Sequence, residues 1–411
     1  MPLFRRHMGG GLRLAALALT AFTLQTDDFV IIGVLPSIAR GLSVTEAAAG
    51  QLVTVFSVIC AVVAPIAAVA TASWPRRRLL AGGMLLFCAA NLAVPLATSY
   101  PALMTLRVLA ALAAAVVLPT VFAVTAALAP PGRQGRDLAT VMAGLTGAVV
   151  AGVPAGTWIG AALGWQATFV SNGLLGVAAL AFLLIALPDV APPPAAGMAE
   201  RLRPLAHPAL VFVLLAAIIA VLGNLLFQTY LGPFLADVAG VDSTGLGWLL
   251  LLAGAAGIAG ARLSGTLVDR IGPARTFAVA IAVFTAAMTG LALSWTLRPA
   301  HVALVVLPLV VWSAAAWAVP PPVQARALAF AGSQAGPQAL ALVSSAVYLG
   351  ASLGAGLGGW LLGTFGTGTL PVAAGTCAIV ALALFALAGR TAPATDTASG
   401  RTKSEPHHTT I

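Results

Sequence analysis

Charged side chains are scarce in this chain: Asp, Glu, Lys and Arg make up only 8% of its 411 residues. A soluble globular domain is about 25% charged, so a water-soluble fold of this size could not cover its surface. The hydrophobic residues, 60% of the total, come in blocks of roughly 20, the length that crosses a hydrocarbon layer about 30 Å thick. The composition therefore excludes a soluble fold and indicates a membrane protein.

Two further absences narrow the function. The three cysteines, Cys60, Cys88 and Cys377, lie inside apolar blocks without metal-ligand or pairing spacing, which is typical of small core residues. The sequence also contains no phosphate-binding loop, no Ser/His/Asp set and no His-rich metal motif. We therefore expect neither an enzyme nor a bound cofactor or metal ion.

The apolar blocks predict helices. Only helices or closed barrels satisfy every backbone polar group inside a bilayer, and long Ala- and Leu-rich runs without period-2 alternation favour helices. We expect the first span to be retained rather than cleaved as a signal peptide, because its apolar run resumes after two Asp residues. Polar and Pro/Gly breaks separate twelve predicted spans at 12–36, 47–70, 78–97, 101–128, 137–162, 166–187, 208–235, 244–267, 275–295, 301–320, 337–363 and 370–390.

The widest break, residues 188–207, is rich in proline and predicts a cytoplasmic linker between two halves of six spans each. The other predicted units are a cytoplasmic N-terminus (1–11), an N-terminal bundle (12–187), a C-terminal bundle (208–390) and a disordered cytoplasmic tail (391–411).

Basic residues are distributed asymmetrically over the predicted loops. Of the 20 Lys and Arg residues, all but four fall in the termini and alternate loops of one side. Arg40 and Arg298 fall on the opposite side, and Arg107 and Arg262 lie within spans. Positive residues stay on the cytoplasmic side, so both termini are expected there. The net charge of +9 thus reflects membrane orientation rather than nucleic-acid binding.

The two halves resemble each other. The fifth span, GLTGAVVAGVPAGTWIGAALG, and the eleventh, SSAVYLGASLGAGLGGWLLG, both carry small residues at three- and four-residue spacing. A parallel repeat of two six-helix halves is a transporter architecture, with the site between the halves near the bilayer midplane. The predicted fold is therefore an all-α membrane protein with twelve helices in two pseudo-symmetric bundles.

Two adjacent acids, Asp27 and Asp28, interrupt the first span, and Arg107 interrupts the fourth. An ionised carboxylate at membrane depth is costly, so it pairs with a charge, faces water or binds a proton. Adjacent helical residues point about 100° apart, so we expect one acid, Asp28, to face a central cavity and Arg107 to pair with it or tune it. The alternatives are two solvated acids at the outer rim and a structural Arg107 that caps carbonyls.

The fifth span combines small residues with a proline. Gly at such intervals lets helices approach closely, and a proline frees a carbonyl and kinks its helix. Taken alone, this is helix-packing chemistry. The residues concerned are Gly147, Gly152, Pro154 and Gly156.

The loop after the eighth span, GTLVDRIGPAR, places an acid beside arginines. That acid can cap a helix or accept hydrogen bonds from cytoplasmic Arg groups, so the loop is either a charged latch between helix ends or an ordinary loop. The corresponding loop of the first half, TASWPRRRLL, keeps the arginines but has no Asp. The candidate gating residues are Gly265, Asp269, Arg270, Gly272, Arg76 and Arg77.

Polar and aromatic side chains inside the spans are few and supply the candidates for substrate contact. Individually, each is more typical of interhelical hydrogen bonding or of an interfacial aromatic. Apart from the two acids and Arg107 the predicted cavity has almost no fixed charge, which favours an uncharged or lipophilic substrate, or a cationic one. The candidates are Asn224, Gln228, Tyr230, Trp312, Trp317 and Tyr348.

Together these motifs resemble the major facilitator superfamily over about residues 10–390, and within it the bacterial twelve-span drug:proton antiporters of the chloramphenicol-resistance and sugar- or purine-efflux-like branch. TDDFVIIGVLPSIARGL looks like the first-span motif of that branch, with Asp28 in the place of its acid. LRVLAAL is similar to the fourth-span motif with Arg107, although Ala111 replaces the usual Gly. GAVVAGVPAGTWIG resembles the antiporter motif of the fifth span, and GTLVDRIGPAR resembles the cytoplasmic loop motif.

The resemblance implies a proton-coupled efflux transporter of the inner membrane that works by alternating access. Asp28 would take a proton from outside as substrate leaves and release it inside, and Asp27 is the next candidate. The implied partners are a small-molecule substrate, protons and the lipid bilayer, and we expect a monomer. A proton-coupled importer and a membrane sensor or assembly protein are the alternatives. The antiporter motif counts against the first, and the short loops count against the second.

Overall fold

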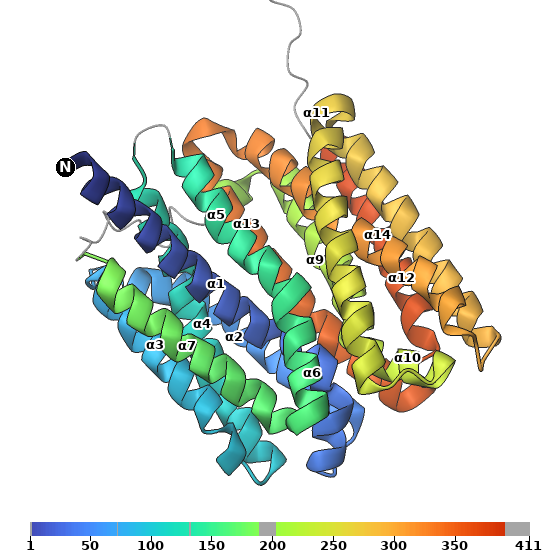
Figure 1. Cartoon of the computed structure of the whole chain (residues 1–411). Coiled ribbons are helices and arrows are strands. Elements are labelled where there is room, and N and C mark those ends of the chain that lie inside the picture. The colour runs from blue at the N-terminus through green and yellow to red at the C-terminus, as the bar shows by residue number, and fades with distance from the viewer. Residues whose placement is uncertain (1, 72, 131–132, 189–202, 391–411) are drawn as a thin grey trace, which may run out of the picture.

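The computed structural model describes residues 2–71, 73–130, 133–188 and 203–390, and within them every regular element is a helix (Figure 1). The first half contains α1 (Pro2–Gly41), α2 (Glu46–Ala70), α3 (Arg76–Leu92), the 3₁₀ turn η1 (Val94–Leu96), α4 (Tyr100–Leu128), α5 (Gln134–Gly147), the π-helical turn η2 (Ala148–Gly152), α6 (Val153–Leu163) and α7 (Trp165–Ala186). The second half contains η3 (Arg203–Ala206), α9 (Pro208–Gln228), α10 (Leu231–Ala239), α11 (Ser243–Thr296), α12 (Val302–Trp317), α13 (Pro320–Phe365) and α14 (Thr369–Arg390).

These helices provide twelve membrane crossings. Among the described residues, 11 helical segments are long and apolar enough to cross a bilayer. One of them, α11, has 54 residues and would be about 81 Å long if straight, more than twice the thickness of a hydrocarbon core. At Gly272 its backbone leaves the helical region, with φ 81° and ψ 163°, a conformation that favours glycine. The chain turns back there (Figure 1), so α11 is two spans and the predicted all-α, twelve-helix fold is confirmed.

Two predicted span boundaries differ from the structure. The predicted seventh span, 208–235, is interrupted, because α9 ends at Gln228 and α10 begins at Leu231. Pro233 explains the break, since a proline has no N–H to donate and its ring clashes with the carbonyl four residues earlier. The predicted loop between the tenth and eleventh spans is helical: α13 begins at Pro320, in keeping with the preference for proline in a first helical turn.

The helices form two bundles. In the first half, α1 packs on α2, α5, α6 and α7, while α4 packs on α2 and α3. In the second half, α9 packs on α13 and α14, and α11 packs on α12 and α14.

α1 already begins at Pro2, within the predicted N-terminal segment. Residues 189–202 of the predicted linker and the whole predicted tail, 391–411, lie outside the described residues, so these domain limits remain predictions.

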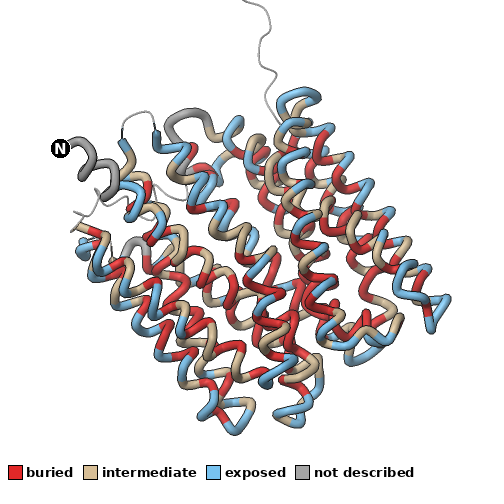
Figure 2. Tube along the Cα trace, viewed as in Figure 1, coloured by how far each residue is buried: buried red, intermediate tan, exposed pale blue. Residues whose placement is uncertain are grey.

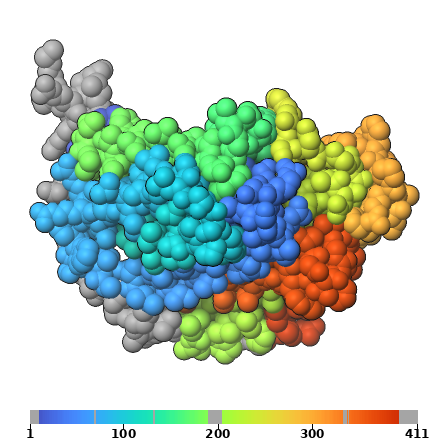
Figure 3. All heavy atoms as spheres, turned by 90° about the horizontal axis from the view of Figure 1, so that it is seen from below, coloured from blue at the N-terminus to red at the C-terminus, as the bar shows by residue number. Residues whose placement is uncertain are grey.

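The two bundles touch at the end of the molecule that carries the α1–α2 and α6–α7 connections, here called the closed end. Trp158 of α6 and Trp248 of α11 lie with ring centroids 4.7 Å apart. A Cβ at Gly254 of α11 would come within 2.9 Å of the backbone of Val150 in η2. Figure 3 looks onto this end, where the surfaces of the bundles meet without a central opening. Away from it, α5 and α11 diverge (Figure 1).

Buried apolar side chains form two clusters, one shared by the two bundles and one within the N-terminal bundle. One cluster joins both bundles and includes Leu35 of α1, Phe234 of α10 and Leu246 of α11. The buried members of the other cluster all come from residues 16–187, and Tyr348 of α13 packs against it. Buried positions line the inner faces of the helices in both bundles (Figure 2). The bundles therefore share a core toward the closed end, while the N-terminal bundle keeps a second core of its own.

We expect Gly260→Ala to destabilise the protein. A Cβ at Gly260 would overlap the backbone of Ala314, so α11 and α12 could not keep their present separation, and overpacking of this kind costs about 1–3 kcal/mol. Gly265→Ala is the matched control, because nothing lies within 4 Å of a Cβ there and alanine is the better helix former. Thermal unfolding of the detergent-purified variants compares the two; equal stability would contradict the close α11–α12 contact.

Candidate functional site

A buried ion pair joins α1 to α4 inside the N-terminal bundle. Nη1 of Arg107 lies 2.6 Å from Oδ2 of Asp27, and Nη2 donates to the backbone carbonyl of Asp27 at 3.3 Å. The two side chains have only 1% and 0% of their surface exposed, so the alternative of a solvated acid does not hold for Asp27. Breaking a buried pair leaves an uncompensated charge, and the pair therefore ties the two helices together.

Side chains from two more helices complete the surroundings of this pair. Nδ2 of Asn172 in α7 donates to Oδ1 of Asp27 at 3.2 Å, so both carboxylate oxygens are hydrogen-bonded. The guanidinium of Arg107 lies 4.7 Å from the ring centroid of Phe56 in α2 and 5.7 Å from that of Phe169 in α7. Ring faces attract cations. Four helices thus converge on one charged pair.

Asp28 stands in a different environment from its neighbour. It is only partly buried, and its carboxylate accepts no hydrogen bond from another described residue. It lies within electrostatic range of Arg107 and of Tyr348, which comes from α13 in the other bundle. Because adjacent helical residues point about 100° apart, α1 turns Asp27 into its own bundle and Asp28 toward the boundary. The ion pair of Arg107 is thus with Asp27, not with the predicted Asp28, which Arg107 affects only through its field.

The fifth span lays its small residues against α1, the helix that carries both acids. A Cβ at Gly152 would overlap Thr26, and one at Gly156 would overlap a valine one turn further along α1. Gly147 stands at ordinary contact distance from the same helix. The π-helical turn η2 ends at Gly152, two residues before Pro154, as expected where a proline cannot donate to the preceding turn. Gly152 and Gly156 therefore set the distance between the fifth span and α1.

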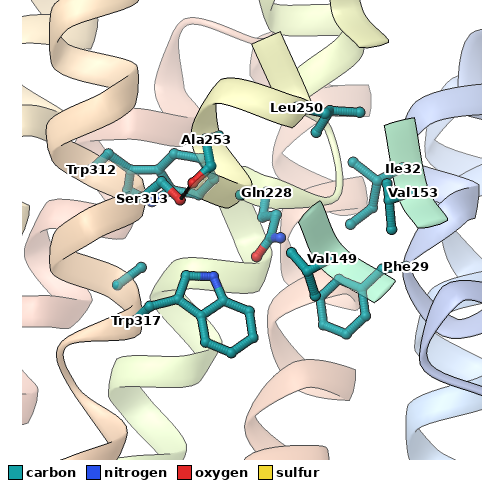
Figure 4. Close-up of a pocket in the computed structure, with 12 residues that line it drawn as sticks. Phe29, Ile32, Val149, Val153, Gln228, Leu250, Ala253, Trp312, Ser313 and Trp317 are labelled. Carbon is teal, nitrogen blue, oxygen red and sulfur yellow. Dashed lines mark hydrogen bonds between the residues drawn. The ribbon is translucent and has the colours of Figure 1, made fainter. Parts of the chain in front are cut away.

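A pocket lies between the two bundles (Figure 4). Its walls come from α1, η2 and α6 on one side and from α9, α11 and α12 on the other. Phe29 and Val149 belong to the first wall, and Gln228, Trp312 and Trp317 belong to the second. No charged residue is among those that line it. Apolar walls with a few polar groups are typical of sites for neutral ligands, and the cavity in the present state is small, about 20 Å³.

Four of the six predicted substrate contacts meet at this pocket. Gln228, Trp312 and Trp317 line it. Asn224 lies behind them and bonds to two of the three: Nε1 of Trp312 donates to its Oδ1 at 3.1 Å, and its Nδ2 donates to Oε1 of Gln228 at 3.0 Å. The cluster that the sequence analysis singled out in span seven is therefore connected to the tryptophans of span ten.

The two predicted tyrosines lie elsewhere. Tyr230 is fully buried toward the closed end, where its hydroxyl donates to the carbonyl of Ala355 at 2.9 Å and its ring meets α2 at Gly50. Tyr348 packs against the core of the N-terminal bundle, within electrostatic range of Asp28. Both tyrosines thus belong to the contact between the bundles rather than to the pocket.

The predicted gating loop of the second half lies at the turn of α11, away from the closed end. Gly272 makes that turn with its positive φ, and Gly265 stands in open space. Asp269 and Arg270 are exposed. Asp269 has no hydrogen-bond or ion-pair partner within the part of the chain that the structure describes, so no charged latch is formed there in the present state.

The arginines of the corresponding loop in the first half bind backbone carbonyls. Nη2 of Arg77 donates to the carbonyl of Leu184 near the end of α7 at 2.6 Å, and Nη1 of Arg76 donates to that of Thr71 at 3.3 Å. Carbonyls at helix ends lack intrahelical partners and favour positive groups. These arginines therefore bind carbonyls at the ends of α2 and α7.

Sequence reasoning missed the aromatic rings around Arg107 and the apolar wall of the pocket. Phe56, Phe169 and Phe29 are ordinary apolar residues within apolar spans, and only Phe29, directly after Asp28, carried a signal in its neighbour. No group of three or more His, Cys, Asp or Glu side chains that could hold a metal ion comes together among the described residues.

Comparison with known proteins gives both a family and relatives. The sequence model of the Major Facilitator Superfamily matches residues 17–336 and 213–410. The chain is 31% identical over 390 residues to the inner membrane transport protein YdhP of Escherichia coli (strain K12), an alignment that covers 93% of this chain and 97% of that protein. It is 37% identical over 273 residues to the chloramphenicol resistance protein of Streptomyces lividans, covering 66% and 69% respectively.

Solved structures share the arrangement of helices. A bacterial homolog of the human lysosomal transporter Spinster, in an inward-facing and occupied conformation, matches with a TM-score of 0.73 over 92% of this chain and 96% of that one, at 18% identity. At this identity the likeness shows the fold alone.

We expect the two neighbouring acids to differ in their contribution to stability. Asp27→Asn leaves Arg107 buried without a counter-charge and is expected to cost about 3–5 kcal/mol, whereas Asp28→Asn removes no ion pair and is expected to have little effect. Thermal unfolding of the purified variants in detergent measures the difference. Adding Arg107→Met to Asp27→Asn should recover part of the loss, and an equal loss at both acids would contradict the asymmetry between them.

Proposed function

Because the chain belongs to the major facilitator superfamily, we propose that this transporter exports small uncharged or lipophilic compounds across the inner membrane in exchange for protons. It alternates between a state open to one side of the membrane and a state open to the other. Both termini face the cytoplasm, as the distribution of arginines predicts, and the closed end faces outside. The present state therefore faces the cytoplasm.

The observation that carries this proposal is the contrast between the two adjacent acids. Asp27 is held by Arg107 and Asn172, so its charge is compensated in place. Asp28 has no such partner among the described residues and lies at the boundary between the bundles, near Tyr348. A carboxylate at membrane depth that is neither paired nor fully solvated binds a proton when its surroundings dry and releases it when water returns. Asp28 is the proton carrier.

Proton entry from outside supplies the driving force. The membrane potential contributes about 2.3 kcal/mol per charge for every 100 mV. Arg107 lies within electrostatic range of Asp28, so protonation of Asp28 changes the field at the buried ion pair. The charge state of one acid is thereby linked to the packing of α1 on α4.

The fifth span connects α1 with the contact between the bundles. The turn η2 touches α1 on one side and α11 on the other, and Gly152 and Gly156 allow the fifth span to lie close to α1. A shift of α1 therefore reaches α11 through η2. Gating at the opposite, cytoplasmic end involves Gly265, Asp269, Arg270, Gly272, Arg76 and Arg77.

The pocket supports a neutral substrate and a monomeric transporter. No charged residue lines it, so neither an anion nor a cation finds a counter-charge there. One chain supplies both of its walls, so a second copy is not needed to complete it. Chloramphenicol, named by the Streptomyces lividans relative, is an uncharged aromatic compound and is the first substrate to test.

We expect cells that express the protein to accumulate less chloramphenicol than cells with an empty vector, because export lowers the internal concentration. An uncoupler that collapses the proton gradient should abolish the difference. Uptake of radiolabelled chloramphenicol, run beside a panel of other neutral aromatic compounds, measures it. Higher accumulation of any compound would indicate import, and no change across the panel would count against a transporter of this substrate class.

We expect Asp28→Asn to abolish transport driven by a proton gradient in proteoliposomes while substrate binding is retained, because the amide cannot carry a proton. Asp137→Asn, at an acid in the first turn of α5 and outside both the ion pair and the pocket, is the matched control and should transport normally. Gradient-driven transport by Asp28→Asn at the wild-type rate would show that Asp28 is not the carrier.

A further inference from the structure

Gln228 presents a free hydrogen-bond donor to the pocket between the bundles. Its side chain has only 9% of its surface exposed, and Figure 4 shows its amide lying between Trp317 and Val149. Oε1 accepts from Asn224, one turn earlier on α9, at 3.0 Å. The amide nitrogen donates to no other described residue. A buried amide with an unused N–H is a place where a ligand oxygen gains a partner.

A side-chain amide can rotate by 180° and exchange the positions of its oxygen and nitrogen. The orientation of the Gln228 amide is fixed by Trp312, through Asn224. The indole N–H can only donate, and it donates to Oδ1 of Asn224 at 3.1 Å. Nδ2 of Asn224 is therefore left to donate to Oε1 of Gln228, which leaves the nitrogen of Gln228 for the pocket. Turning over either amide would set two donors or two acceptors face to face.

The other polar groups of the pocket agree with this direction. Trp317 lines the same pocket, and its indole N–H donates to no other described residue. Ser313 donates its hydroxyl hydrogen to the carbonyl of Ala253 at 2.6 Å, the contact drawn as a dashed line in Figure 4. No carboxylate lines the pocket. The ligand therefore meets two unused donors, on Gln228 and Trp317, between apolar walls.

We propose that this pocket selects neutral compounds that present a hydrogen-bond acceptor, such as a carbonyl, nitro or ether oxygen, to Gln228, and that Trp312 is a positioning residue that sets this polarity through Asn224. The inference rests on the proposed function, because it takes the pocket to be the place where the transported compound binds. A compound of the same shape that carries only a donor gives up its hydrogen bonds with water and meets a second donor.

Three probes of nearly one shape test this selection. The bridge between the two rings is an acceptor in benzophenone, a donor in diphenylamine and neither in diphenylmethane. Binding of each tritiated probe to the purified full-length transporter in nanodiscs is measured, with excess unlabelled probe to correct for partition into lipid. Wild-type protein is expected to bind benzophenone about three- to tenfold more tightly than diphenylmethane, and diphenylamine more weakly than benzophenone.

Two variants separate the donor from its positioning residue. Gln228→Leu removes the amide at similar volume and is expected to weaken benzophenone binding about three- to tenfold while leaving diphenylmethane unchanged. Trp312→Phe keeps a ring but removes the N–H, so both amides can turn over and the benzophenone-to-diphenylamine affinity ratio should fall toward one. A merely structural role of Trp312 would weaken all three probes alike. Gln51→Leu is the matched control, since Gln51 bonds to its own helix outside the pocket.

Equal affinity of the wild type for the three probes, or an equal loss for all three in Gln228→Leu, would overturn the inference. This readout does not depend on export, because it is taken on purified protein without a proton gradient. Selective binding together with unchanged cellular accumulation would reject the proposed export and keep the site. Export without selective binding would reject the acceptor-selective pocket alone.

Discussion

Asp27 and Arg107 bring opposite charges together at membrane depth, where neither could remain ionised alone. Both carboxylate oxygens of Asp27 are hydrogen-bonded, one by Arg107 and the other by Asn172, and the rings of Phe56 and Phe169 lie beside the guanidinium. Four helices must hold their positions for these contacts to persist, so the rotation of α1 about its own axis is set. That rotation also determines the direction of every other side chain on α1.

Three consecutive residues of α1 face three surroundings as a result. Asp27 points into the core of its bundle, Asp28 has no ion pair and lies within electrostatic range of Tyr348 of α13, and Phe29 lines the pocket. Steps of about 100° along one helical turn are enough to place a paired charge, an unpaired carboxylate and a ring that lines the pocket next to one another. The fifth span lies along the same helix through its glycines and meets α11 through η2, so α1 contacts the ion pair, the pocket and the element that reaches the other bundle.

Much of the architecture could be predicted from composition and pattern, because twenty-residue apolar blocks and charges within them are rare and strong signals. The sequence could not predict which acid pairs with Arg107. Adjacent acids on a helix point about 100° apart, and the rotation of α1 about its axis decides which of them meets Arg107. Gln228 and Tyr230 looked like one cluster, yet α9 ends between them and sends one to the pocket and the other to the contact between bundles. The apolar wall of the pocket gave no signal, because apolar residues fill every span.

The tryptophan pair at the closed end has a spectroscopic consequence. Trp158 and Trp248 belong to different bundles, and their rings lie 4.7 Å apart at an interplanar angle of 55°. Indoles this close and this inclined share their electronic excitation, which splits into two bands of opposite sign in circular dichroism. The rings of Trp158 and Trp248 move apart when the bundles separate at the closed end, so this pair of bands is lost together with the contact. The chain thus carries an intrinsic optical marker of the contact between its two bundles, with no label attached.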